Sequence, residues 1–326
     1  PIPAKGEEKY RFDWVTPIVL SQYSNKKIYL GGNRLFITRD GGISWQRTED
    51  LTKNINRDSL QIMGVLGADI TLSKNDGTST FGEIISISES PIRNREVWVG
   101  TDDGNVQVTK DDGISWTEVS QNILGLPKNS YVSRVMASRK GRGHAYVTFD
   151  RHREGDWAPY VYKTEDYGKT WELITSGITE NYYTRAIRSD KKRDGLLYAG
   201  TEWGMFISFD DGRSWNKFQL NLPVTSIRDI AVKENDLIVA THGRSFWMID
   251  DLTPLHQLND NSKSDKFILF KPDLSYRLAQ SGGWRKPNTL LVGENHPNGV
   301  IINYFIKNYN EVDFVKIEIL DKDGSL

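Results

Sequence analysis

The stretch Thr164-Glu165-Asp166-Tyr167-Gly168-Lys169-Thr170-Trp171 decides the fold, because its pattern Ser/Thr-x-Asp-x-Gly-x-x-Trp recurs in the chain without a gap. The other copies are Thr38–Trp45, Thr109–Trp116 and Ser208–Trp215. A hydroxyl and a carboxylate two residues apart bind backbone groups of their own turn, and the glycine supplies a positive φ that other residues resist. The Trp offers an indole that packs between neighbouring sheets. Each copy, called the box below, is therefore expected to form the corner of a β-hairpin.

The acidic residues of the boxes resemble catalytic residues, but short polar residues in turns are usually turn formers. We therefore expect their carboxylates and indoles to stabilise the hairpin corners rather than to act on a substrate. The residues expected to have this structural role are Asp40, Trp45, Asp111, Trp116, Asp166, Trp171, Asp210 and Trp215.

The surroundings of the boxes repeat as well. Ahead of the last box, the run Leu197-Tyr198-Ala199, a turn with Gly204 and the run Met205-Phe206-Ile207 indicate a hairpin. A fifth, degenerate unit ends at Asp250, about 40 residues after Asp210, and a period of roughly 40 residues with four short strands per unit is typical of propeller blades. The sequence therefore predicts an all-β fold, a β-propeller of four-stranded antiparallel blades with insertions near residues 51–81 and 150–159.

The domain organisation follows from these units. Residues 1–255 are predicted to hold about five blades, and residues 256–265 to form a linker. The blades either close as a five-bladed ring or are part of a larger ring, and the start without Met favours the larger ring. Residues 266–326 are predicted to begin an Ig-like β-sandwich. The strands expected in this last part are Lys266–Pro272, Val300–Ile306 and Phe314–Leu320, the last two paired, with turns at Ser281–Gly283 and Pro297–Gly299.

Composition excludes several functions. The chain has 326 residues, a net charge of −1 and no cysteine, so it has no disulfide and no thiolate metal site, and no global basic field for a nucleic acid. No apolar run approaches the roughly 18 residues of a membrane span. The five histidines show no metal-ligand spacing, and we expect no metal and no cofactor. Because the chain starts at Pro1 without Met and ends after a strand-like run, we expect it to be a piece of a larger parent chain.

The boxes, the run Tyr160–Trp171 and the run Ala240–Asp251 resemble bacterial BNR-repeat (Asp-box), sortilin-like β-propeller proteins, which are often named glycosyl hydrolases by analogy. The resemblance covers Phe12 to Leu255, and Ile301–Gly324 resembles the Ig-like domain that follows in such proteins. It implies an extracellular, cell-surface or periplasmic location and further blades, but no reaction. Asp boxes also occur in sialidases, xyloglucanase-like enzymes, sortilin receptors and photosystem assembly factors, so the fold does not define the function.

Three arginines are candidates for binding a ligand. Arg134, Arg185 and Arg228 occupy similar registers in the predicted innermost strands and could converge on an anion or a carboxylate. Sialidases use such a trio, but their tyrosine–glutamate pair and Arg-Ile-Pro strand are not recognisable here. The alternative is that these arginines pair with carboxylates of the blades, such as Asp229.

Two further residues are candidates. His242 lies at the glycine turn of the fifth hairpin, where a structural hydrogen bond is the alternative to a ligand contact. Trp157, in the insertion, can stack on a sugar or anchor a peptide, or it can cover the edge of a blade. Of the carboxylates outside the boxes, four lie in predicted loops or at strand starts without a catalytic motif: Asp150, Glu154, Glu202 and Asp229.

Three functions stay open. The first is an exported binding module whose loops take a protein, peptide or glycan. The second is a glycoside hydrolase, xyloglucanase-like or sialidase-like, which needs two carboxylates about 5–10 Å apart, one of them with a raised pKa. The third is a structural spacer of a larger exported protein. A pocket lined by such a pair of acids would distinguish a glycoside hydrolase from a binding module.

Overall fold

The computed structural model describes residues 1–72, 74, 81–258, 265–275, 299–307 and 314–325. The chain divides into two compact units, Pro1–Asp250 and Asp251–Leu326. Among the described residues, no helix is both long and apolar enough to cross a membrane.

The first unit is built of antiparallel sheets that follow one another along the chain, as predicted. Four sheets have four strands each and the fifth has three. The strands are β1 (Ile18–Leu20), β2 (Ile28–Gly31), β3 (Arg34–Thr38) and β4 (Gln46–Asp50); β7 (Ile84–Glu89), β8 (Val97–Thr101), β9 (Val106–Thr109) and β10 (Thr117–Glu118); β11 (Tyr131–Ala137), β12 (Ala145–Asp150), β13 (Tyr160–Thr164) and β14 (Glu172–Leu173); β15 (Thr184–Ser189), β16 (Leu197–Thr201), β17 (Gly204–Ser208) and β18 (Asn216–Lys217); and β19 (Ile227–Lys233), β20 (Asp236–Thr241) and β21 (Phe246–Ile249).

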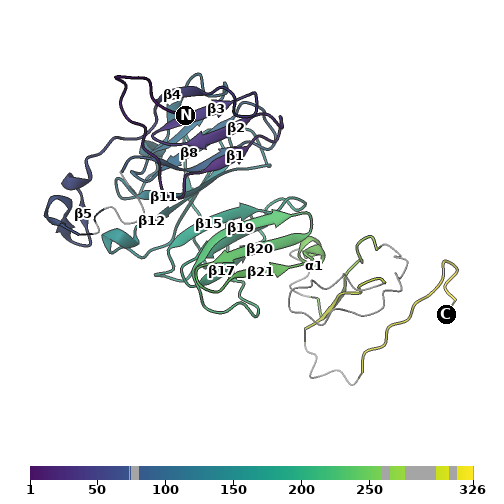
Figure 1. Cartoon of the computed structure of the whole chain (residues 1–326). Helices are drawn as coiled ribbons and strands as arrows, with labels where there is room; N and C mark the ends of the chain where they lie inside the picture. The colour runs from purple at the N-terminus through teal and green to yellow at the C-terminus, as the bar shows by residue number, and fades with distance from the viewer. Residues whose placement is uncertain (73, 75–80, 259–264, 276–298, 308–313, 326) are drawn as a thin grey trace, which may run out of the picture. The chain divides into compact units, whose positions relative to one another are not determined.

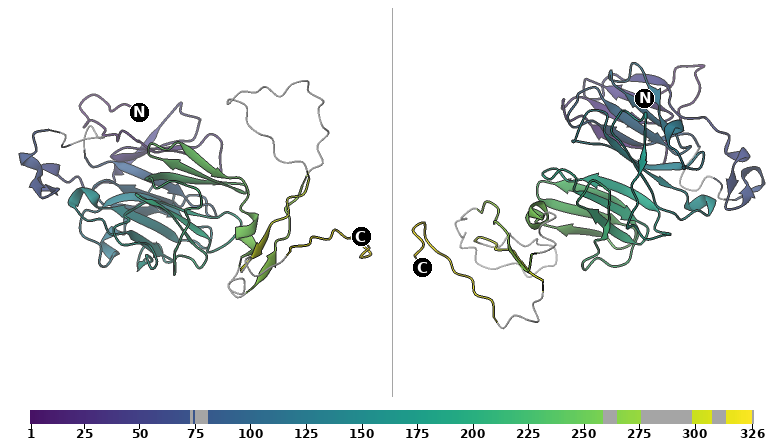
Figure 2. Two further views of the ribbon diagram at one scale, coloured as in Figure 1. Left: turned by 90° about the horizontal axis from the view of Figure 1, so that it is seen from below. Right: turned by 180° about the vertical axis from the view of Figure 1, so that it is seen from behind.

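Successive sheets pack against each other through their first strands. Strand β7 contacts β11, β11 contacts β15, and β15 contacts β19, as the sheets follow one another in Figure 1 and Figure 2. Packing of this kind, with each sheet a separate unit and its first strand innermost, is the arrangement of propeller blades. The predicted all-β propeller fold is therefore confirmed.

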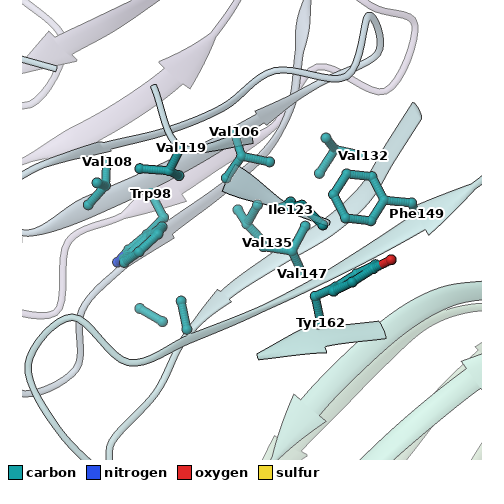
Figure 3. Close-up of a cluster of buried hydrophobic side chains, with 12 residues drawn as sticks. Trp98, Val106, Val108, Val119, Ile123, Val132, Val135, Val147, Phe149 and Tyr162 are labelled. Atoms are coloured by element: carbon teal, nitrogen blue, oxygen red, sulfur yellow. The ribbon is translucent and has the colours of Figure 1, made fainter. Parts of the chain in front are cut away.

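The core between the second and third sheets shows how the blades are held together. Figure 3 shows Trp98 on β8 and Phe149 on β12 among valines from both sheets, all of them buried. The indole of the third box, Trp171, packs at the edge of this core with its ring centroid 6.3 Å from that of Trp98, in an edge-to-face arrangement. Each large apolar side chain buried in this way stabilises the fold by about 1.5–3 kcal/mol.

The boxes form the hairpin corners, and their side chains are engaged within the turn. In the third box the Thr164 hydroxyl donates to the Asp166 carboxylate at 2.9 Å and accepts from the Gly168 amide at 2.9 Å. The same carboxylate accepts from the Thr170 amide at 2.9 Å. The other boxes repeat these bonds at 2.7–3.0 Å, through Asp40, Asp111 and Asp210.

The indoles of the boxes differ in one detail. Those of Trp45, Trp116 and Trp171 donate to the carbonyl of their own box glycine. The indole of Trp215 is almost fully buried and donates instead to the Ile174 carbonyl of the preceding sheet at 2.8 Å. The fourth corner is therefore tied directly to its neighbour.

The first insertion adds irregular structure beside the third sheet. It holds the 3-10 helices η1 (Arg57–Ser59) and η2 (Gly67–Asp69) and a small hairpin of β5 (Gln61–Ile62) and β6 (Val65–Leu66). The Met63 amide in the turn of this hairpin donates to the Arg153 carbonyl in η4 (His152–Glu154) at 2.8 Å. A further 3-10 helix, η3 (Ser120–Asn122), follows β10.

The second unit contains the helix α1 (Thr253–Gln257) and a strand pair, β22 (Phe267–Leu269) with β23 (Tyr304–Ile306). The expected pairing of Val300–Ile306 with Phe314–Leu320 was wrong, because the strand within the former pairs with Phe267–Leu269 and the latter forms no strand. Alternation of apolar residues in Phe314–Leu320 indicated a strand but could not identify its partner. The turn at Ser281–Gly283, most of Pro297–Gly299 and residues 259–264 of the predicted linker lie outside the described residues.

Candidate functional site

A candidate site lies at the end of the sheets opposite the boxes. Near this end the first strand of each of the last four sheets carries a β-bulge, an extra residue that the neighbouring strand does not match. The register shifts leave Ile85, Ser133, Arg185 and Arg228 as the extra residues. A bulge re-aims its side chain, so this position presents residues to the sheet end in each of these four sheets.

A second repeated position lies next to the bulge, at the end of the second strand. In successive sheets it is occupied by Asp102, Asp150, Glu202 and His242. Three carboxyl groups and one imidazole are thus brought to one end of the unit by the repeat itself. Sites on propellers and other repeat folds are built in this way, from equivalent positions of successive units.

Several of these side chains line one pocket with a volume of about 200 Å³, called the strand-end pocket below. Insertions add to its wall through η1, β5 and η4. The charged residues that line it are Arg57, Asp102, Asp150, Arg153, Glu154, Arg185 and Arg228.

Asp102 is the most unusual acid of the pocket. Its side chain is buried, and its carboxyl oxygen accepts from the Glu83 amide at 2.7 Å and from the Gly82 amide at 3.1 Å. Burial raises its pKa to about 8, and the neighbouring Asp103 and Glu83 carboxyls add to this, although the two amides oppose it. At pH 7 Asp102 is therefore mostly protonated and can donate a proton.

Asp150 lies in the opposite environment. Its carboxylate forms an ion pair with the Arg185 guanidinium at 3.2 Å and contacts the His152 ring nitrogen at 2.5 Å. Arg185 also pairs with Glu202 of its own sheet at 2.7 Å, and Glu202 accepts from the Ser226 hydroxyl of the next sheet at 2.7 Å. One network of ion pairs and hydrogen bonds therefore links three successive sheets at the strand-end pocket.

An aromatic group lies beside this network. The His152 ring stacks on the Tyr183 ring at a centroid distance of 4.9 Å, and the Trp157 ring meets Tyr183 edge-to-face at 5.5 Å. The Arg185 guanidinium lies 4.7 Å from the centroid of the Tyr183 ring. Tyr183 is buried, whereas Trp157 is 40% exposed, so Trp157 presents the accessible aromatic surface of the group.

The structure brings together two of the three expected arginines. Arg185 and Arg228 line the strand-end pocket, and Arg134 does not. The bulge in β11 falls at Ser133, so the equivalents of Arg134 in the next two sheets are Ala186 and Asp229. The expectation that all three arginines share one register was therefore wrong, because Arg134 is displaced by one residue. Side chains alternate between the two faces of a strand, so a shift of one residue places a side chain on the opposite face.

Arg134 has a structural partner instead. Its guanidinium pairs with Asp229 of the fifth sheet at 3.0 Å, and Arg188 pairs with the same carboxylate at 2.7 Å. Burial lowers the pKa of Arg188 to about 10, and the Arg134 charge adds to this. The alternative of arginines paired with blade carboxylates thus describes Arg134 and also Arg185, which pairs with Asp150 and Glu202.

His242 is placed next to Arg228. The Nε and Nη2 atoms of Arg228 lie 3.1 Å and 2.6 Å from the Nδ1 atom of His242, which accepts. The His242 amide donates to the Ser226 carbonyl at 2.9 Å, which holds the imidazole at the end of β20. Both expected residues therefore lie at the same end of the fifth sheet.

The sequence interpretation missed Asp102, Arg153 and Arg57 as residues of this site. A signal for Asp102 was present, since it follows a strand just as Glu202 follows the equivalent strand two sheets later. No such signal existed for Arg57, which comes from an insertion. Within the part of the chain that the structure describes, no group of three His, Asp or Glu residues is arranged to hold a metal ion.

Comparison with known proteins agrees with the fold. A family model described as BNR/Asp-box repeat matches residues 36–47. An oligoxyloglucan-reducing end-specific xyloglucanase from Emericella nidulans is 27% identical over 128 residues, which are 37% of this chain and 14% of that enzyme. The structure of an ancestral GH74 enzyme matches with a TM-score of 0.50 and 13% identity, over 71% of this chain and 28% of that chain.

The GH74 xyloglucanase from Xanthomonas campestris is similar with a TM-score of 0.47 and 15% identity, over 76% of this chain and 36% of that chain. This chain therefore spans less than two fifths of the length of each of these relatives. Together with the five sheets and their corners, the matches identify a BNR-repeat β-propeller with a GH74-like fold. A specific relation to sortilin-like proteins stays a prediction.

Proposed function

We propose that this chain is part of an exported glycoside hydrolase and that the strand-end pocket binds the sugar at the scissile bond. The observation that carries the proposal is the pair of carboxyl groups in that pocket, Asp102 and Asp150, which lie in opposite environments. Glycoside hydrolysis requires a carboxylic acid and a carboxylate beside one bond. The similarity to GH74 enzymes supports the same class of reaction.

In this mechanism Asp102 is the general acid. It transfers its proton to the glycosidic oxygen as the bond between that oxygen and the anomeric carbon breaks. The Asp150 carboxylate accepts a proton from the water that forms the new bond to the anomeric carbon. Arg185 positions Asp150 through their ion pair at 3.2 Å.

The test is release of reducing sugar from a panel of neutral and uronic-acid-containing polysaccharides. We expect Asp102→Asn and Asp150→Asn each to reduce the rate by about 100-fold or more, since each removes a proton-transfer step. Asp194→Asn is the matched control. Asp194 is exposed in the turn between β15 and β16, at the end of the fourth sheet that lies away from the pocket. Full activity in both pocket variants would contradict the proposal.

The pH dependence gives a second readout of the same assignment. A general acid works only while it is protonated, so the rate should fall as pH rises through the pKa of Asp102, about 8. The rate should be restored when the same sample is returned to pH 7. A rate that rises steadily from pH 7 to pH 10 would exclude Asp102 as the acid.

A binding module without chemistry is the second candidate. It is favoured by the exposed Trp157 and by the network that engages Asp150 and Glu202 in ion pairs. In that case glycan binding would depend on Trp157, and no reducing sugar would be released by the parent protein. Calorimetry with Trp157→Ala beside the activity assay distinguishes the two functions.

A further inference from the structure

We infer that the strand-end pocket selects a sugar that bears a carboxylate, and that Arg228 receives this carboxylate. The inference rests on the proposed function for the assignment of the pocket to a glycan, and it adds the chemical class of the substrate. It is carried by the charge of the pocket and by the geometry of Arg228.

The charge of the lining is the first argument. Four arginines line the pocket beside three carboxyl groups, and one of the three, Asp102, is mostly protonated at pH 7. Burial also raises the pKa of a second one, Glu154, although the Arg151 charge opposes this. The lining therefore holds more guanidinium groups than carboxylates. Glu202 neutralises Arg185 and the Asp13 charge interacts with Arg153, so an anionic group is attracted where a guanidinium lacks a carboxylate partner.

The second argument is that Arg228 is not neutralised as Arg185 is. Arg185 pairs with Asp150 and with Glu202. Within the described ranges, Arg228 has no carboxylate partner, and its hydrogen bonds go to the imidazole of His242. A guanidinium whose partner is an imidazole rather than a carboxylate keeps its charge available to an anionic ligand.

The geometry of Arg228 is the third argument. The His242 ring binds its Nε–Nη2 edge, and this fixes the plane of the guanidinium. The Nη1 atom makes no hydrogen bond to any residue that the structure describes, and Nη2 retains a second N–H. These two groups form the fork that binds both oxygens of a carboxylate. His242 is therefore a positioning residue for Arg228.

The pocket also limits the size of the ligand. Its volume of about 200 Å³ is below the ~300–1,000 Å³ of sites for drug-sized molecules, so it accommodates one sugar unit rather than a long segment. Trp157, which is 40% exposed on the same insertion as the lining residues Arg153 and Glu154, offers a flat surface to an adjoining sugar. A hexuronic acid unit within a glycan has this size and this charge.

The experiment compares oligogalacturonate with the same oligosaccharide after reduction of its carboxyl groups. Binding is measured by calorimetry at pH 7 on the Asp102→Asn protein, in which hydrolysis should be slow. We expect the acidic oligosaccharide to bind at least about tenfold more tightly than the reduced one, because a charge-assisted bidentate contact is lost on reduction. Arg228→Gln should remove this preference, and Arg228→Lys should restore only part of it. His242→Gln should weaken the preference without changing the affinity for the reduced oligosaccharide.

Arg213→Gln is the matched control. Arg213 is an exposed arginine in the fourth box, at the opposite end of β17 from the pocket, and its substitution should leave the preference unchanged. Equal affinity for the two oligosaccharides would overturn the inference and leave the proposed function standing if the parent protein cleaves neutral polysaccharides. An Arg228-dependent affinity for a glutamate-rich peptide, with neither oligosaccharide bound, would overturn the inference and count against the proposed function.

Discussion

Asp111 and Asp102 lie in different environments, which differ in burial and in whether the hydrogen-bond donors belong to the same turn. Asp111 in the second box accepts from its own Thr109, and from both the amide and the hydroxyl of Ser115. Burial would raise the pKa of Asp111, but these bonds lower it to about 2. For Asp102, burial outweighs the two amides that it binds, and its pKa is raised to about 8. The spacing of residues in the sequence identifies an aspartate such as Asp111. It does not identify one such as Asp102, because the pKa of Asp102 depends on the segments that bury it.

Asp102 should make the protein less stable at high pH. Its pKa in the folded state lies above the ordinary value of about 3.9, so its contribution to stability is fully present below pH 4 and is lost as pH rises towards 8. Urea unfolding of the parent and of Asp102→Asn at pH 5 and pH 9 measures this. We expect the stability of the parent to decrease more between the two pH values than that of the variant. An identical change in both proteins would contradict the raised pKa.

At the scale of the element, the hairpin corner was predictable because its contacts are local. The box hydroxyl, carboxylate and glycine interact within eight residues, so the pattern alone specifies the turn. The innermost strands with Arg185 and Arg228 were also predicted in the right places. The bulges were not, and for this reason Arg134 was assigned to the wrong register.

The box glycine has a second role that only its surroundings reveal. Gly168 has φ +75°, and a Cβ there would lie 2.6 Å from the Cβ of Val119 in the preceding sheet. Gly125 has φ +78°, but a Cβ there would meet no atom within 4 Å. Both Ala variants share the backbone strain, about 1 kcal/mol, and Gly168→Ala should cost about 1–3 kcal/mol more through overpacking. Thermal or urea unfolding checks this, and equal losses would show that the corner does not pack on the neighbouring sheet.

At the scale of the first unit, successive sheets are joined by buried charges as well as by apolar contacts. Asp211 of the fourth sheet accepts from the Tyr146 hydroxyl and from Lys140 of the third, the latter at 2.8 Å. Asp112 of the second sheet accepts in the same way from Tyr29 and Lys27 of the first. In each case the acid is the residue just before the box glycine, so the box also connects one blade to the next.

Asp211→Asn should therefore destabilise the first unit by about 1–3 kcal/mol at pH 7. Burial would raise the pKa of Asp211, but bonds from Lys140 and Tyr146 lower it overall. A lowered pKa gives stability that is present above pH 4 and is lost as pH falls through the value in the folded state. The difference between the parent and the variant should thus shrink as pH falls from 7 to 3, as urea unfolding can measure. Asp194→Asn, which changes an exposed turn, should unfold like the parent at both pH values.

The sequence by itself determined the repeating units, their antiparallel hairpins and the corners that end them, because each depends on contacts within a few residues or on a period that the side chains display. Only the tertiary structure decided which of the polar residues share a pocket. Bulges select Arg185 and Arg228 and exclude Arg134, and an insertion brings Arg57 to the wall. It also decided the protonation of Asp102, since the removal of water from a carboxyl group depends on segments distant in the chain.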